Sequence, residues 1–276
     1  MGGTSTVTLA AGLTLSYREQ GEPSEPAVVL LPGPTDSWRS YQPVLARLPR
    51  SIRAIAVSQR GHGDSDKPVT GYRVADFAAD VPALLDAVGI ERAVLVGHSG
   101  SCLVARRVAI DHPHRVAGLV LEASPSTLAG DRGLTEFVET IASMLEDPVD
   151  PAFVRSFVVD TSSAHVAPEV VDLLADEVLK VPARVWRETF SGLLRDDDRG
   201  ELPLVRAPTL LVWGDADEVI GRQAQEELLR GLANATLVVY AGAGHTPRWE
   251  DPRRFAADIA TFAERLRRRP HDAMDG

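Results

Sequence analysis

Three short motifs in this 276-residue chain combine residue types that can perform nucleophilic chemistry. The first is Gly97-His98-Ser99-Gly100-Ser101, in which small residues flank a serine directly after an apolar run. The others are Gly214-Asp215-Ala216-Asp217 and Gly242-Ala243-Gly244-His245, each ending a later apolar run. A serine hydroxyl is a poor nucleophile near neutral pH unless a histidine takes its proton and a carboxylate orients that histidine. The chain order serine, aspartate, histidine therefore predicts a site for acyl transfer.

Alternating strands and helices must bring these motifs together. Apolar runs predict buried strands at 27–31, 52–57, 93–96, 116–121, 209–213 and 236–240. Helical patterns lie between and after them, near 74–88, 222–232 and 252–268. Residues 6–18 predict a hairpin with an antiparallel edge. Such alternation is typical of a mostly parallel sheet with helices on both faces. Because parallel strands end at one edge of a sheet, we expect the three motifs to meet there.

The strand pattern disappears between residues 124 and 203. Four amphipathic helical segments replace it, at 134–145, 151–159, 168–179 and 183–194. Breaks rich in proline or aspartate separate them, and the run 196–198 marks the return to the sheet. The sequence therefore predicts a helical cap (124–203), inserted after the sixth strand of a core formed by 1–123 and 204–276.

The combination of motifs resembles the α/β-hydrolase superfamily from Val7 to Leu266. The resemblance rests on the serine turn, on the glycine-rich loop at 60–65 and on the two late turns with Asp217 and His245. It implies an α/β-hydrolase fold: a mostly parallel eight-stranded sheet, helices on both faces and an inserted helical cap.

Carried over residue by residue, the resemblance makes Ser99 the nucleophile, His245 the general base and then acid, and Asp217 the orienting carboxylate. Asp215 is interpreted as a residue that caps its turn. Some relatives place the acid after the strand that follows the serine, where this chain has Glu122. Glu122 is therefore the alternative acid, with a supporting hydrogen-bonded carboxylate as its other interpretation.

The predicted oxyanion hole departs from the family pattern. The backbone N–H of Gly100 is expected to be one donor. The second position falls on Pro34, in a loop that usually reads His-Gly-x and here reads Pro-Gly-Pro. Proline has no N–H, so either Thr35 supplies the donor or the hole is one donor short, at a cost of about 3 to 4 kcal/mol in the transition state. Ser101 also stands where glycine is usual.

The cap carries several aromatic residues and the chain shows no obvious charged clamp, which favours an apolar carboxylic ester or lactone of small to medium size as substrate. Trp186 is predicted to contact it, and the packing core of the cap is assigned to Phe137, Phe153, Phe157 and Phe190. The resemblance implies hydrolysis through an acyl-enzyme on Ser99. Two alternatives stay open: carbon–carbon bond hydrolysis of a β-diketone-like substrate, and a receptor-like protein with slow turnover because Pro34 removes one donor.

Composition excludes several other classes. The net charge is −10, and phosphate contact needs clustered basic residues, so no nucleic-acid partner is expected. The single cysteine, Cys102, cannot form an internal disulfide. No apolar run approaches 18 residues and no leader pattern precedes Ala11, so we expect a cytoplasmic protein without a membrane partner. Neither a metal nor a cofactor is expected, and a homodimer is left open.

Overall fold

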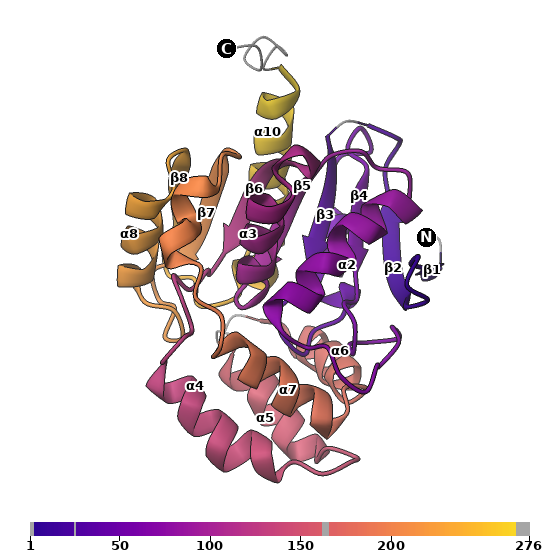
Figure 1. The fold of residues 1–276 in the computed structure, drawn as a ribbon, viewed down its shortest axis with the longest axis vertical. Helices are drawn as coiled ribbons and strands as arrows, with labels where there is room; N and C mark the ends of the chain where they lie inside the picture. Colours follow the sequence, from indigo (N-terminus) through magenta and orange to yellow (C-terminus); the bar gives the residue numbers. More distant parts are fainter. Residues whose placement is uncertain (1–2, 25, 162–165, 269–276) are drawn as a thin grey trace.

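An eight-stranded sheet forms the centre of the computed structural model, which describes residues 3–24, 26–161 and 166–268 (Figure 1). The strand order is β1-β2-β4-β3-β5-β6-β7-β8. These strands are β1 (Ser5–Thr8), β2 (Thr14–Gln20), β3 (Ala27–Leu31), β4 (Ala54–Val57), β5 (Ala93–His98), β6 (Val116–Glu122), β7 (Thr209–Gly214) and β8 (Ala235–Tyr240). Strand β2 pairs antiparallel with β1 and β4, and the other neighbours are parallel. The predicted fold class is confirmed, including its antiparallel edge.

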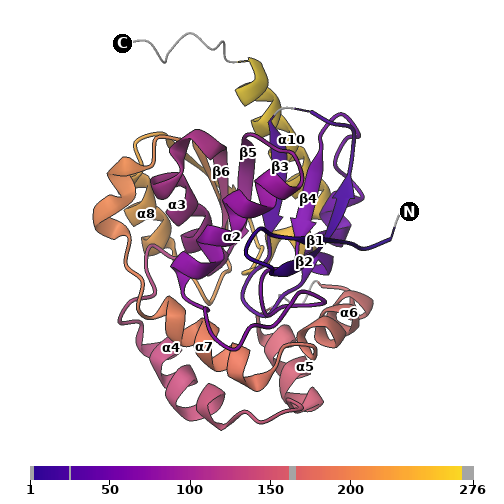
Figure 2. The ribbon, with the colours of Figure 1, turned by 45° about the vertical axis from the view of Figure 1, so that its right-hand side comes forward.

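Helices cover both faces of the sheet, which explains why its central strands are apolar on both sides. The helices are α1 (Gln42–Leu45), α2 (Val74–Ala87), α3 (Ser101–Asp111), α4 (Arg132–Glu136), α5 (Pro151–Asp160), α6 (Pro168–Val178), α7 (Ala183–Leu193), α8 (Arg222–Gly231), α9 (Pro247–Glu250) and α10 (Pro252–Arg268). Helices α2, α3 and α8 pack on one face, and α1 and α10 on the other. Figure 2 shows α2 and α3 on one side of the sheet and α10 on the other. Within the described ranges, no helix is long and apolar enough to cross a bilayer.

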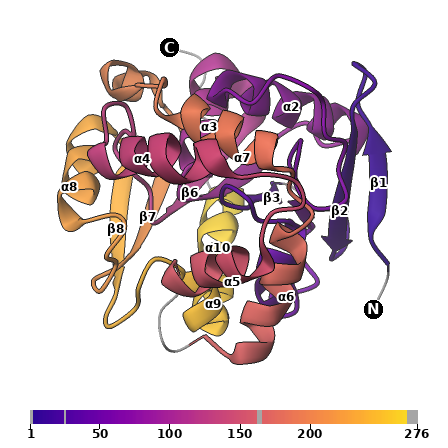
Figure 3. The same cartoon turned by 90° about the horizontal axis from the view of Figure 1, so that it is seen from below.

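Helices α4 to α7, which lie between β6 and β7 in the chain, form a layer below the sheet in Figure 1, and Figure 3 shows this layer from below. One predicted helix, 134–145, differs in the structure. Helix α4 ends at Glu136 and continues as a π-helical turn over Phe137–Ile141 and a 3-10 turn over Ala142–Met144. The hydroxyls of Thr140 and Ser143 donate to backbone carbonyls four residues earlier. Such bonds compete with the regular helical ladder and bend it.

A buried arginine of α3 ties both ends of this helical layer to the sheet. The Arg106 guanidinium pairs with Asp198 on the returning segment at 2.6 and 2.7 Å. It also donates to the backbone carbonyls of Pro125 and Ser126 on the outgoing segment, at 2.7 and 3.1 Å. Both charged side chains are almost completely buried. One charged centre thus anchors both ends of the helical layer.

Candidate active site

Ser99 occupies a tight turn between β5 and α3. Its φ of +52° lies in the left-handed region, which a serine adopts only when its surroundings hold it there. The backbone N–H of Ser99 donates to the carbonyl of Glu122 on β6 at 2.9 Å. A Cβ atom on Gly97 would lie 2.8 Å from the Ser101 carbonyl oxygen, so glycine is needed where helix and strand approach. The turn holds the Ser99 side chain at the carboxyl edge of the sheet.

Asp217 and His245 come from neighbouring loops, after β7 and β8, and meet as a buried pair. The Nδ1 atom of His245 lies 3.0 and 3.2 Å from the two carboxylate oxygens of Asp217. The Asp217 carboxylate also accepts the backbone N–H groups of Val219 and Ile220, at 2.8 and 2.9 Å. A carboxylate only accepts, so Nδ1 of His245 carries the proton and Nε2 is left as an acceptor. Asp215, also in the β7 loop, holds the β8 loop by accepting the Gly242 N–H at 2.6 Å.

A cavity of about 320 Å³ lies between the strand ends and the helical layer. Ser99 and His245 both line it, and Phe137, Phe157 and Phe190 form much of its opposite wall. Among the described residues, its lining contains no lysine or arginine. In the described structure, the side chains of Ser99 and His245 are not hydrogen-bonded to each other. Hydrogen bonds between side chains of such sites are often long without substrate and tighten when it binds.

Pro34, at the second predicted oxyanion position, contributes only surface to the site. Pro34 lines the cavity beside the serine turn, where a Cβ atom on Gly100 would lie 3.0 Å from its ring. Pro34 has no N–H, so it contributes surface and no hydrogen bond. Gly100 lies directly before α3, and the N–H groups at a helix start are free of the helical ladder. Thr35 is buried with φ +73° and does not line the cavity.

Glu122, the alternative acid, binds an arginine that follows the histidine loop. Its carboxylate accepts the backbone N–H of Arg248 at 2.8 Å and lies 3.4 Å from its guanidinium. That guanidinium also pairs with Asp36 at 2.8 Å and donates to the Ser40 hydroxyl at 3.0 Å. The network connects β6, the loop after β3 and the start of α9. Glu122 therefore supports the loop of His245, and Asp217 is the acid that contacts its ring.

His98, Asp36 and Arg248 are site residues that the sequence did not single out. The His98 ring donates from Nε2 to the backbone carbonyl of His245 at 3.0 Å and lines the cavity. Burial, followed by the charges of Arg248 and His245, holds the pKa of His98 well below its usual value. His98 is thus a neutral donor that positions the histidine loop. Its place next to the serine was visible in the sequence, but its partner was not.

Trp186 lies elsewhere than predicted. Its indole is completely buried within the helical layer, with ring centroids 4.8 Å from Phe157 and 5.6 Å from Phe153. It does not line the cavity. Phe137, Phe157 and Phe190, which the sequence assigned to packing, form the cavity wall in front of it. The aromatic cluster therefore has two layers, and Trp186 supports the layer that faces Ser99.

We predict that Glu122→Gln changes the pH dependence of stability. Burial raises the pKa of Glu122 from 4.5 to about 7, although Arg248 opposes this. The folded state therefore binds the proton more tightly than the unfolded state, so this carboxyl's contribution to stability falls as pH rises from about 4.5 to about 7. The variant lacks this carboxyl group and its pH dependence. The free energy of unfolding of the variant should therefore rise relative to that of wild type by about 3 kcal/mol from pH 4 to pH 8.

Urea unfolding of both proteins across this pH range measures the effect. The exposed carboxylate of Glu139 provides a matched control, because Glu139→Gln should leave the stability difference from wild type nearly constant. Parallel stability curves for wild type and Glu122→Gln would contradict the assignment of a raised pKa to Glu122.

Comparison with known proteins defines the family. A family model described as alpha/beta hydrolase fold matches residues 26–252. The chain belongs to this family, which confirms the resemblance drawn from the motifs. Strands β3 to β8, the serine turn and the two late loops all lie within the matched range.

Individual relatives extend over most of the chain. A non-heme chloroperoxidase from Streptomyces lividans is 30% identical over 275 residues, covering 94% of this chain and 99% of that protein. A 2-(acetamidomethylene)succinate hydrolase from Mesorhizobium japonicum is 28% identical over 250 residues, covering 84% and 85%. Among solved structures, an esterase from Rhodococcus sp. ECU1013 matches with a TM-score of 0.81 and 28% identity, covering 95% of this chain and 99% of that one.

Proposed function

We propose that this protein is a serine hydrolase that cleaves a carboxylic ester or lactone through an acyl-enzyme on Ser99. The observation that carries the proposal is the placement of Ser99, on a left-handed turn, at the same apolar cavity as the buried Asp217–His245 pair. A strained turn that exposes a serine beside a carboxylate-oriented histidine is the arrangement that acyl transfer requires. The relationship to an esterase supports this reaction class.

In this mechanism, the Ser99 hydroxyl oxygen attacks the substrate carbonyl carbon while Nε2 of His245 takes the hydroxyl proton. Asp217 holds the imidazole in the tautomer that can accept this proton and stabilises the imidazolium that forms. The carbonyl oxygen gains negative charge and is stabilised by the Gly100 N–H. His245 then protonates the leaving alcohol oxygen. Water, activated by the same histidine, releases the acid and restores Ser99.

The cavity favours an uncharged, apolar acyl group. Its wall is built from aromatic and aliphatic side chains of the helical layer, which thereby serves as a cap over Ser99. Among the described residues, the charged side chains that line it besides the proposed machinery are the carboxylates Asp36 and Asp131. A carboxylate on the substrate would lose its hydration in this cavity and would find no cationic partner there, which is unfavourable.

A panel of p-nitrophenyl esters and lactones tests the proposal. The matched pair is p-nitrophenyl butyrate and the p-nitrophenyl hemiester of succinate, which differ in one terminal carboxylate. We expect turnover of the butyrate ester, with kcat/KM at least about 10-fold above that of the hemisuccinate, because the charged acyl group loses hydration without gaining a partner. Absence of turnover across the panel, with ligand binding retained, would contradict the hydrolase proposal and favour a receptor-like role.

A further inference from the structure

Ser101, the first residue of α3, stands where the family usually has glycine. Its side chain is 3% exposed and points away from solvent. The hydroxyl donates to the backbone carbonyl of Pro32 at 2.6 Å. Pro32 lies directly after β3 and begins the loop that carries Gly33 and Pro34 past the serine turn. The extra hydroxyl therefore connects the helix behind Ser99 to the predicted oxyanion loop.

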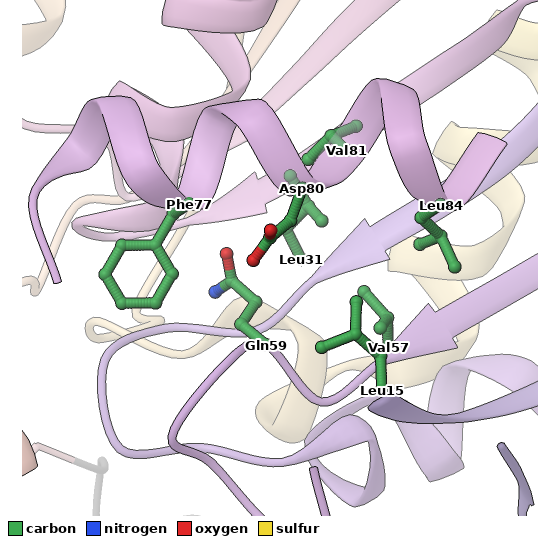
Figure 4. Close-up of a pocket in the computed structure, with 8 residues that line it drawn as sticks. All are labelled: Leu15, Leu31, Val57, Gln59, Phe77, Asp80, Val81 and Leu84. Atoms are coloured by element: carbon green, nitrogen blue, oxygen red, sulfur yellow. The ribbon is translucent and has the colours of Figure 1, made fainter. Parts of the chain in front are cut away.

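Gln59 completes this contact from a third segment, the loop after β4. Its side-chain Nε2 donates to the same Pro32 carbonyl at 3.0 Å and to the Ser101 hydroxyl at 2.9 Å. Figure 4 shows the Gln59 side chain beneath α2, beside Phe77 and Asp80. Gln59 is itself buried. The Pro32 carbonyl is thus held by two buried donors that come from different parts of the chain.

Two prolines limit the hydrogen bonds that this loop can donate. Pro32 and Pro34 lack N–H groups, so neither can donate a backbone hydrogen bond. The loop also fits tightly against the serine turn, since a Cβ atom on Gly33 would lie 2.5 Å from Nδ1 of His98. Thr35, next in the chain, has a left-handed φ of +73°, which must be held by its surroundings. The Asp36 N–H donates to the Gly33 carbonyl at 3.1 Å and closes a turn around Pro34 and Thr35, and the Pro32 carbonyl anchors the start of this turn.

We propose that Ser101 and Gln59 are positioning residues, which hold the Pro32–Pro34 loop against the serine turn and so place the substrate carbonyl relative to Ser99. The inference rests on the proposed hydrolase function. Neither residue lines the cavity, so both act through the loop. A small displacement of a reacting group is enough to slow a reaction strongly. Loss of this contact should therefore lower kcat more than it weakens substrate binding.

The test compares Ser101→Gly, which restores the family residue, with Ser65→Gly. Ser65 is an apt control because it is equally buried at 3% exposure and its hydroxyl also donates to a backbone carbonyl, that of Ser58, at 2.6 Å. Ser65 does not line the cavity. Active sites are counted by complete labelling with a fluorophosphonate. We expect kcat per labelled site to fall about 10- to 100-fold in Ser101→Gly, with KM within about threefold of wild type, and to stay unchanged in Ser65→Gly.

A second variant tests whether Gln59 and Ser101 act on kcat through the same contact. Gln59→Met removes both side-chain donations and should lower kcat to a similar extent. Because the two residues hold one carbonyl, the effects of Ser101→Gly and Gln59→Met should be less than additive in the double variant. Full activity per labelled site in Ser101→Gly, or losses that simply multiply in the double variant, would overturn the inference. A wild type that neither labels nor turns over esters would instead refute the proposed function.

Discussion

Replacing Ser99 with alanine should lower kcat on the order of 10⁶-fold for any ester that the wild type hydrolyses. Alanine removes the attacking hydroxyl, and the cavity and the Asp217–His245 pair keep their geometry. Since serine and alanine both carry a Cβ atom, the left-handed backbone is equally strained in the two proteins. Burst and steady-state kinetics, together with thermal unfolding, measure activity and folding separately. The melting temperature should change little.

Ser99→Gly provides a matched control for this loss. Glycine adopts a positive φ without steric cost, so this variant should be more stable than Ser99→Ala by about 1 kcal/mol. It should be equally inactive, because it also lacks the hydroxyl. Retention of more than about 1% of wild-type kcat in either variant would contradict the role of Ser99 as nucleophile.

Asp217→Asn should lower kcat about 10⁴-fold. The amide oxygen can still accept the N–H groups of Val219 and Ile220, so the loop is expected to keep its structure. The amide nitrogen, however, would donate to Nδ1 of His245 and force the proton onto Nε2. That tautomer cannot take the proton from Ser99. The loss should appear in kcat, whereas substrate binding in the apolar cavity stays close to wild type.

Glu122→Gln is the contrasting variant. The Glu122 carboxylate contacts Arg248 and not the His245 ring, so its replacement costs about one hydrogen bond and kcat should fall less than about 10-fold. A single series of assays on both variants thus distinguishes the two acids that the sequence offers. If Glu122→Gln lost about 10⁴-fold in kcat and Asp217→Asn kept its activity, the geometric assignment of the acid would be wrong.

Local sequence patterns were sufficient to predict the sheet and the loops that meet at its edge. Strands such as β3 and β5 are uninterrupted apolar runs because both of their faces are covered. The motifs that follow these strands end at one edge, as parallel pairing requires. Helix α7 was predicted to within one residue, because the amphipathic period of a helix is also a local pattern.

Contacts between distant segments could not be predicted. Arg248 binds Glu122, which is 126 residues away, and in the sequence it resembles any surface arginine. Trp186 and Phe190 lie one turn apart on the same side of α7, so the sequence could not tell which of them meets the cavity. The docking of α7 decides this, and it places Phe190 at the wall. The partner of the Ser101 hydroxyl likewise became evident only when the β3 loop was in place.

Mass-spectrometric mapping of the native protein after reaction with a fluorophosphonate tests the role of Ser99 most directly. We expect one adduct per chain, on the peptide that contains Ser99, with parallel loss of esterase activity. Heat-denatured protein and Ser99→Ala should remain unlabelled, because activation requires the folded site and its hydroxyl. An active wild type that forms no adduct at Ser99, or that loses activity through an adduct at another residue, would contradict it.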